Sequence, residues 1–444
     1  MSEQEFPDGK IRFEIEELGP IRDSVIDFKP FLLFSGESNT GKSYTAMAVY
    51  YLFYMLNNKD IMSTLAHKLI DIEQIEKTLA PGKKIEFEPT ERFITELVKL
   101  YNKHINQFLG YMLGHENFEC KLNLKLQIPR FPLKNPSIIY PQKKEKLPYI
   151  ELNMPFPEGG DWGHLVFELG KDRLKDSIRS FVSRVCERFI FGKSYANFFL
   201  PPARGAFSGL TWPDFQKFSG IGMYQEFLQG IESVRFNDFE MSTETEKKNK
   251  LFETIFTKLL NGNIKVEKDR EIYTVAGTGI EIPLNAASSS VREISPLHRL
   301  LKRVSTNRLS ICIEEPEAHL HPELQRGVGQ LLSYVVNRGG FVQATTHSDF
   351  FINQVNNLLK LHFIKNKNQD KFKKSLKDTG IGKEFVLNPA NMGPYFFEKV
   401  NGGVHARKLE IFDKGMPMES FEKTYDQSVT ETWNLREALS DEEE

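Results

Sequence analysis

One short segment limits what this chain can fold into more than any other. Residues 36–43 read GESNTGKS, which fits the pattern G-x-x-x-x-G-K-[ST] and lies between two apolar runs. Glycines let the backbone curl so that successive N–H groups point inward, and such a nest at a helix N-terminus favours phosphate. The segment therefore predicts a buried strand at residues 31–34, a phosphate-binding loop, and a helix from Tyr44 onward.

The loop also indicates how a nucleotide would be held. Lys42 is placed to reach the terminal phosphates, and the hydroxyl of Ser43 is placed to hold Mg²⁺. A guanine nucleotide is disfavoured, because residues 366–370 (NKNQD) lack the acidic residue of the guanine-reading pattern N-K-x-D. ATP is therefore the expected ligand, and its candidate contacts are Gly36, Asn39, Thr40, Gly41, Lys42, Ser43 and Tyr44.

Composition narrows the class of protein. With 40% hydrophobic and 27% charged residues the chain reads as globular, and its 444 residues exceed one typical domain. A net charge of −2 gives no overall positive field that would draw it onto nucleic acid. Three cysteines without a CxxC pair, a polar N-terminus and no apolar run long enough to span a bilayer predict a cytoplasmic protein without membrane contact.

Apolar strands alternate with helical patterns near both ends of the chain. This alternation around a phosphate loop predicts an α/β sheet that is buried on both faces. We expect residues 1–60 and 263–430 to form one nucleotide-binding core from two halves of the sequence. Residues 61–262 then form a mainly helical insertion with a proline-rich segment, and residues 431–444 form an acidic tail.

Two further strand ends carry polar residues suited to a nucleotide site. The apolar residues 309–313 are followed by Glu314 and Glu315. In phosphate-loop enzymes an acid at such a strand end holds Mg²⁺, and a following glutamate can orient or deprotonate the attacking water. A second apolar strand ends in Thr346, His347 and Ser348. We therefore expect Glu314 to be a metal ligand and Glu315 and His347 to be catalytic residues.

Ser288, Ser289 and Ser290 precede a helix that opens at Val291. Hydroxyl groups and free N–H groups at a helix start bind phosphate, although a plain serine cap is the common alternative. One nucleotide site already has its loop, acids and histidine. A second phosphate-binding helix start therefore fits best if it serves the nucleotide of another subunit.

Together these segments resemble the Walker A, signature, Walker B/D-loop and H-loop motifs of ABC-type ATPases, within the SMC/RecF/OLD-like group. The resemblance rests on residues 36–43, Ser288–Ser290, CIEEPEAHLHP and TTHSDFF, and it covers about residues 10–57 and 264–363. It implies an α/β P-loop NTPase of ABC-ATPase type, with a mixed sheet and flanking helices. It also implies a homodimer or higher homo-oligomer that holds ATP between one Walker A loop and the opposite signature.

The chain departs from the family pattern at three places. Ser290 stands where the signature usually has glycine, and Glu314 stands where aspartate is commoner. A Q-loop glutamine is not evident, and Arg204 is the candidate for that region. Arg204 belongs to FFLPPARG, which is similar to a Pro-Ala-x-Arg turn of compact bacterial ATPases in this group.

The motifs leave three roles open. No D-x-D follows Ser348 and no long heptad run is visible, so a nuclease domain and a coiled-coil arm are not expected. The leading hypothesis follows the resemblance to ATPase subunits of bacterial antiphage systems such as PARIS and Septu, which pair with a separately encoded effector such as a nuclease. The alternatives are a RecF/SMC-like DNA-binding ATPase in repair, with nucleic acid as the partner, and an ATP-stabilised, non-catalytic assembly scaffold.

Overall fold

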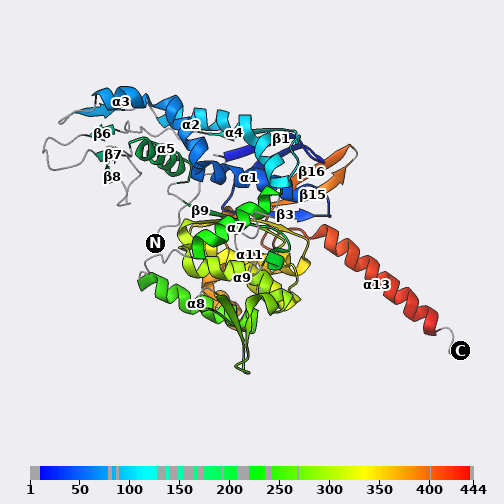
Figure 1. The fold of residues 1–444 in the computed structure, drawn as a ribbon. Coiled ribbons are helices and arrows are strands. Elements are labelled where there is room, and N and C mark those ends of the chain that lie inside the picture. The colour runs from blue at the N-terminus through cyan, green and yellow to red at the C-terminus, as the bar shows by residue number, and fades with distance from the viewer. Residues whose placement is uncertain are drawn as a thin grey trace.

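A nine-stranded mixed sheet forms the centre of the molecule (Figure 1). The computed structural model describes residues 11–78, 83–86, 90–127, 137–139, 149–153, 164–168, 174–191, 195–207, 220–235, 243–267, 270–400 and 402–440. The strand order is β5-β1-β2-β16-β15-β3-β14-β13-β9. The bounds of these strands are β1 Ile11–Leu18, β2 Ile21–Asp27, β3 Phe31–Gly36, β5 Cys120–Leu126, β9 Ala196–Leu200, β13 Leu309–Glu314, β14 Phe341–Thr346, β15 Met392–Val400 and β16 Gly403–Lys408.

The two halves of the sheet differ in direction. From β15 through β3, β14 and β13 to β9, every neighbouring pair is parallel. On the other side β1 pairs antiparallel with both β2 and β5, and β15 pairs antiparallel with β16. The expected fold class, a mixed α/β sheet with flanking helices around a phosphate loop, is confirmed. In the parallel half, the carboxyl ends of β3, β13 and β14 meet at one edge of the sheet.

Helices cover both faces of the parallel half, so its central strands are buried throughout. Alternate residues of β3 therefore enter two separate cores: Leu32 and Phe34 face one, and Phe31 and Leu33 face the other. The first core contains α1 (Lys42–Asn57), α2 (Lys59–Leu69), α4 (Thr90–Leu113) and α5 (Leu174–Phe191). The second contains α7 (Gly222–Arg235), α8 (Thr243–Leu260), α9 (Ser289–Arg303), α10 (Pro322–Asn337) and α11 (Asp349–Lys367).

Residues 61–262 supply strands as well as helices. Strand β5 extends the sheet at one edge by pairing with β1, and β9 closes the other edge beside β13. A separate four-stranded sheet has the order β4-β6-β7-β8, and its strands are Lys84–Glu86, Ser137–Ile139, Tyr149–Asn153 and His164–Glu168. The short helix α3 (Ile72–Thr78) precedes it. The division into core and insertion stays a prediction, but this part of the chain is not purely helical.

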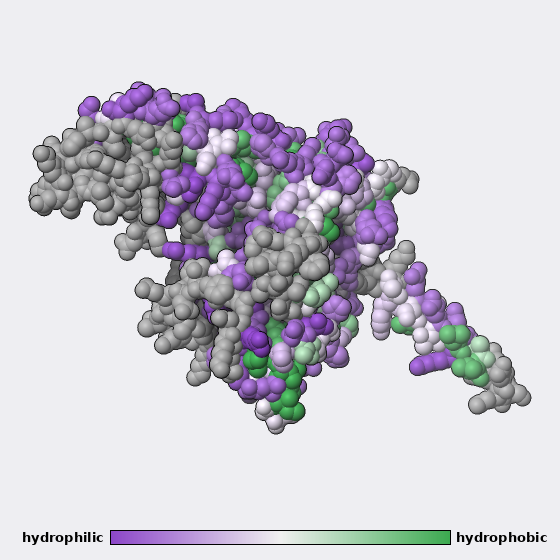
Figure 2. Space-filling view, in the orientation of Figure 1, coloured by the Kyte–Doolittle hydropathy of each residue, from purple (hydrophilic) through white to green (hydrophobic). Residues whose placement is uncertain are grey.

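The last helix, α13 (Glu419–Ser440), extends away from the body of the molecule (Figure 1). It takes in residues 431–440 of the expected acidic tail, whereas residues 441–444 lie outside the described residues. Residues 424–439 are exposed, and apolar side chains such as Tyr425, Trp433 and Leu439 lie at its surface (Figure 2). Within the described ranges, none of the helices has both the length and the hydropathy that crossing a bilayer requires.

The remaining elements lie in the second half of the chain. A three-stranded antiparallel sheet joins β10 (Gly262–Glu267), β11 (Arg270–Val275) and β12 (Glu281–Pro283). Helix α12 (Gln369–Thr379) follows α11 and packs against it.

His298 makes part of the stability depend on pH. Its ring lies edge-on against Phe256, with centroids 4.8 Å apart, and burial lowers its pKa to about 3. Between about pH 3 and 6.5 this histidine is protonated in the unfolded chain but neutral in the folded chain. The free energy of unfolding therefore falls as the pH drops below 6.5. From pH 7 to pH 5 we expect this histidine to remove about 2 kcal/mol of unfolding free energy.

Urea unfolding at both pH values measures this loss. The variant His298→Phe should show a correspondingly smaller difference between the two pH values. The control His67→Phe, at an exposed position of α2, should keep the full difference. An unchanged difference in His298→Phe would show that another group titrates.

Candidate nucleotide-binding site

The phosphate loop connects the end of β3 to the start of α1 and adopts a backbone that requires glycine. Gly36 has a φ of 134°, and a Cβ built there would lie 2.5 Å from the carbonyl oxygen of Phe397. Gly41 has a φ of 87°, and its Cβ would lie 2.8 Å from the Ile21 side chain. Side chains at these two positions would collide with β15 and β2. The sheet thus fixes the loop at both ends.

Lys42 lies at the centre of this loop. Its ammonium group donates hydrogen bonds to the carbonyl oxygens of Gly36 (3.1 Å) and Glu37 (2.6 Å), and the Thr40 hydroxyl lies 3.4 Å away. Burial lowers the pKa of Lys42 to about 8, and the nearby carboxylates of Glu315 and Glu314 oppose this shift. The ammonium group therefore remains largely protonated at neutral pH, among oxygen acceptors that phosphate oxygens could replace.

The other loop residues differ in their exposure and in the groups that they contact. Thr40 is buried and its hydroxyl donates to the Glu37 carbonyl oxygen at 2.7 Å. Asn39 is exposed and has a φ of 62°. Tyr44 packs edge-on against Phe118, with ring centroids 5.7 Å apart. The Tyr44 side chain thus faces a neighbouring aromatic ring.

Ser43 and Glu314 meet across the gap between the loop and β13. The Ser43 hydroxyl donates a hydrogen bond to Oε2 of Glu314. The Glu314 carboxyl is buried, and burial raises its pKa to about 7. Its second oxygen, Oε1, has no hydrogen-bond partner in the part of the chain that the structure describes. A buried carboxylate with an unused oxygen beside a loop hydroxyl is a suitable pair of ligands for Mg²⁺.

Mg²⁺ would need further ligands from the nucleotide. Among the described residues, no group of three or more His, Cys, Asp or Glu side chains is arranged to hold a metal ion. Mg²⁺ commonly binds through one or two protein ligands together with substrate phosphates and water. Ser43 and Glu314 fit that kind of site, in which metal and nucleotide bind together.

Glu315 and His347 lie on the same edge of the sheet as the loop. The backbone of Glu315 has a φ of 45°, and its N–H donates to the carbonyl oxygen of Thr345 at 3.0 Å. Burial and the Lys42 charge lower the pKa of His347, whereas Glu315 and a hydrogen bond with the Gly36 backbone raise it. The charges of Lys42 and Glu315 therefore both act on the imidazole of His347.

Glu317 is a residue of this site that the sequence analysis missed. Its Oε1 accepts hydrogen bonds from the Thr346 hydroxyl and from the backbone N–H of His347, both at 2.7 Å. Burial raises the pKa of Glu317. This carboxyl ties the loop after β13 to the end of β14, and so helps to place His347. The sequence signal was the third carboxyl group of EEPE, but sequence alone does not say which way it points.

The three serines lie at the N-terminus of α9. Ser288 caps the helix by accepting a hydrogen bond from the Val291 N–H, and the Ser290 hydroxyl donates to the carbonyl oxygen of His319 at 2.6 Å. Ser288 and Ser289 are exposed. The structure thus brings together Gly36, Lys42, Ser43, Glu314, Glu315 and His347, and it leaves the serine helix start facing outward.

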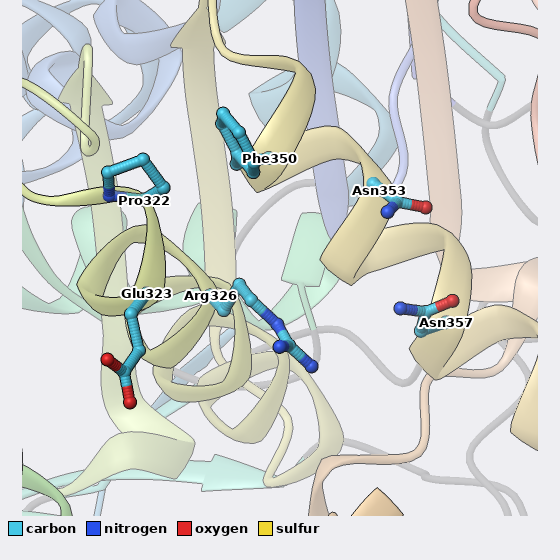
Figure 3. A pocket seen from close by; sticks show the side chains of 6 residues that line it. All are labelled: Pro322, Glu323, Arg326, Phe350, Asn353 and Asn357. Carbon is cyan, nitrogen blue, oxygen red and sulfur yellow. The ribbon is translucent and has the colours of Figure 1, made fainter.

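A separate pocket lies between the N-terminal ends of α10 and α11. It has a volume of about 420 Å³, and the side chains of Pro322, Glu323, Arg326, Phe350, Asn353 and Asn357 line it (Figure 3). The phosphate-loop residues do not contribute to its lining. The pocket is therefore distinct from the predicted phosphate site, although both helices start at the same edge of the sheet.

Comparison with known proteins adds a family match for part of the chain. Residues 223–352 match the family model described as an AAA ATPase domain. The match includes the three serines, Glu314, Glu315 and His347, but not the phosphate loop. No curated protein matches the chain.

Solved structures with a related arrangement are SMC head domains. The SMC head bound to the C-winged helix domain of ScpA shares 11% identity over 91% of this chain and 98% of its own, with a TM-score of 0.38. The SMC head domain from Thermotoga maritima shares 11% identity over 91% of this chain and 100% of its own, with a TM-score of 0.34. The Pyrococcus furiosus Smc head bound to the C-terminal domain of ScpA shares 11% identity over 95% of this chain and 98% of its own, with a TM-score of 0.34.

Proposed function

We propose that this chain binds Mg-ATP at the loop of residues 36–43 and hydrolyses it slowly to ADP and phosphate. The observation that carries the proposal is the convergence of Lys42, Ser43, Glu314, Glu315 and His347 at one sheet edge. The match of residues 223–352 to an AAA ATPase domain supports the same reaction.

Each residue has a distinct part in the proposed reaction. Lys42 exchanges its carbonyl partners for phosphate oxygens and stabilises the charge that develops there. Ser43 and Glu314 hold Mg²⁺, which supplies further charge neutralisation at the phosphates. Glu315 orients or deprotonates the attacking water, and His347 donates a hydrogen bond to the terminal phosphate or the water. The strand ends position these groups before the nucleotide binds.

We propose further that the serine start of α9 completes the site of a second subunit. Ser288 and Ser289 are exposed, and their helix N-terminus favours an anion. In a symmetric dimer the same contact would be made twice, once at each ATP. ATP binding would then hold two subunits together, and hydrolysis would release them.

A native-mass measurement tests this switch. The variant Glu315→Gln, which should bind ATP but hydrolyse it poorly, is expected to double its mass when Mg-ATP is added. Adding Ser289→Arg should prevent the doubling by placing a bulky side chain at the helix start, while ATP binding persists. The matched control Ser305→Arg, at an exposed position just beyond the other end of α9, should still dimerise. A mass that ignores ATP in all variants would contradict the switch.

The cellular role that we propose is a switch or scaffold subunit that controls a separately encoded effector, such as the nuclease of an antiphage complex. The resemblance of the motifs to those ATPase subunits supports it. Co-purification of the chain with proteins encoded beside it, with and without ATP, is the direct test. A non-catalytic scaffold is the alternative if ATP binds but turnover is negligible and Glu315→Gln leaves it unchanged.

A DNA-binding ATPase is a second candidate, and α12 favours it. This helix has four exposed lysines but only two acidic residues, Asp370 and Asp378. The lysines are Lys371, Lys373, Lys374 and Lys377. Such a basic surface could follow a phosphate backbone. This role would be supported if the protein binds duplex DNA with an affinity that falls steeply as salt is added. It would also be supported if duplex DNA stimulates ATP hydrolysis. Binding that is unaffected by changing these lysines to glutamine would exclude this helix as the contact.

A further inference from the structure

Arg204 is a fully buried arginine directly behind the acidic strand end. It begins the short 3-10 helix η2 (Arg204–Phe207) that follows β9, and its side chain is 1% exposed. The preceding residue, Ala203, has a φ of 54°, which residues with a side chain seldom adopt. This turn directs the Arg204 side chain into the protein interior.

The guanidinium group of Arg204 contacts the backbone of both catalytic-site glutamates. Nη1 donates to the carbonyl oxygen of Glu314 at 2.8 Å, and Nη2 lies 3.5 Å from that of Glu315. Glu314 carries the proposed metal ligand, and Glu315 carries the proposed water-activating carboxylate. Because Glu315 has a φ of 45°, the direction of its side chain depends on how this short backbone segment is held.

The same guanidinium group is tied to helix α9. Nε donates to the carbonyl oxygen of Glu293 at 3.1 Å, and Nη1 lies 3.3 Å from the Glu293 carboxylate. The other carboxylate oxygen of Glu293 accepts a hydrogen bond from the Gly205 N–H at 2.8 Å. A Cβ at Gly205 would lie 2.7 Å from that oxygen, so the approach requires glycine. Arginine, carboxylate and turn therefore form one buried unit.

Glu293 lies one helical turn beyond Ser289, which belongs to the serine start of α9. A second contact joins the same two regions, because the Ser290 hydroxyl binds the carbonyl oxygen of His319 in the loop after Glu317. Two contacts therefore link the start of α9 to residues 314–319, one through Arg204 to Glu314 and Glu315 and one through Ser290 to His319. Buried ion pairs are costly to desolvate and often add little net stability, so stability alone does not account for this pair.

We propose that Arg204 and Glu293 are positioning residues that couple the serine start of α9 to the catalytic glutamates. Engagement of α9 by the second subunit's ATP sets the backbone of Glu314 and Glu315, and hydrolysis then becomes efficient. This inference rests on the proposed ATPase function and deepens it. It assigns to this buried pair the control of when Glu315 acts.

The test separates turnover from binding in Arg204→Lys and Glu293→Gln. Lysine keeps the charge but cannot bridge two carbonyl groups and a carboxylate with a planar fork. We expect kcat to fall about 10- to 100-fold, as for partners that orient a metal ligand, with KM for ATP within about two-fold. ATP-dependent dimerisation, measured with Glu315→Gln added, should persist. Because the two residues act as one unit, the double variant should be no slower than the slower single variant.

The control is a comparable ion pair on the same helix. Arg299 binds Glu271 of β11, with Nε and Oε1 2.9 Å apart, and within the described ranges no hydrogen bond or ion pair joins it to residues 314–319. Arg299→Lys should lower the thermal unfolding midpoint without changing kcat. If it lowers kcat as much as Arg204→Lys does, or if KM rises in parallel with the loss of kcat, the coupling is overturned and the pair is merely structural.

Two outcomes distinguish this inference from the proposed function. If Arg204→Lys and Glu293→Gln turn over ATP as fast as the wild type does, the coupling is overturned but the proposed ATPase function stands. A wild-type protein that neither binds nor hydrolyses ATP overturns both. Should Arg204→Lys fail to fold, the isosteric Glu293→Gln still decides the question, because it removes the ion pair without changing the volume.

Discussion

Replacing Glu315 with glutamine is expected to lower ATP turnover by about two to four orders of magnitude, the range that a positioned general base contributes. The amide keeps the shape of the side chain but cannot accept a proton from water. ATP binding should persist, because in the proposed site the phosphate contacts are made by Lys42 and the loop. Phosphate release and equilibrium binding of a fluorescent ATP analogue measure the two effects separately.

The matched control for this change is Glu323→Gln. Glu323 is an exposed acid in the first turn of α10, a short distance along the chain from Glu315. Its substitution should leave turnover near the wild-type value. Equal turnover in the wild type and Glu315→Gln would mean that another group activates the water, or that the protein only holds ATP.

Lys42→Met should abolish most of the affinity for ATP. Methionine keeps much of the apolar stem but removes the ammonium group, whose hydrogen bonds now go to the Gly36 and Glu37 carbonyl oxygens. Loss of a charged hydrogen-bond donor to phosphate costs about 3 kcal/mol, or about 100-fold in the dissociation constant. Isothermal titration with Mg-ATP measures it.

Lys399→Met tests whether any lysine near the loop has the same effect. Its ammonium group pairs with the Glu37 carboxylate at 2.8 Å, on the outer side of the loop where both groups are exposed. Exposed pairs contribute little, so ATP affinity should change only slightly. If both variants bind ATP as the wild type does, the loop is not the nucleotide site.

Local patterns in the sequence were enough to predict the elements next to the loop. Strand β3 and helix α1 follow from an apolar run, a glycine loop and a second apolar run. The ends of β13 and β14 follow from buried strands that stop at polar residues. In each case the signal lies within about ten residues, and parallel strands place such ends at a common edge.

Features that depend on distant contacts were not predictable. Strand β5 pairs with β1 although about a hundred residues separate them, so an edge strand inside a helical segment gave no local sign. Glu293 occurs in the pattern SSVREISPLHRLLKR, where an acid looks like part of a solvated helix face. Only the buried Arg204 behind it shows that this carboxylate faces inward.

Strand β3 forms a common wall between the two hydrophobic cores, and this limits how the loop can move. A slip of one residue would exchange Phe31 and Leu33 with Leu32 and Phe34, forcing each core to accept side chains of the wrong shape. The strand is therefore wedged from both sides, and Gly36 at its end cannot slide along the strand. If the proposed site opens and closes, the movement would therefore have to come from helices that shift against the sheet.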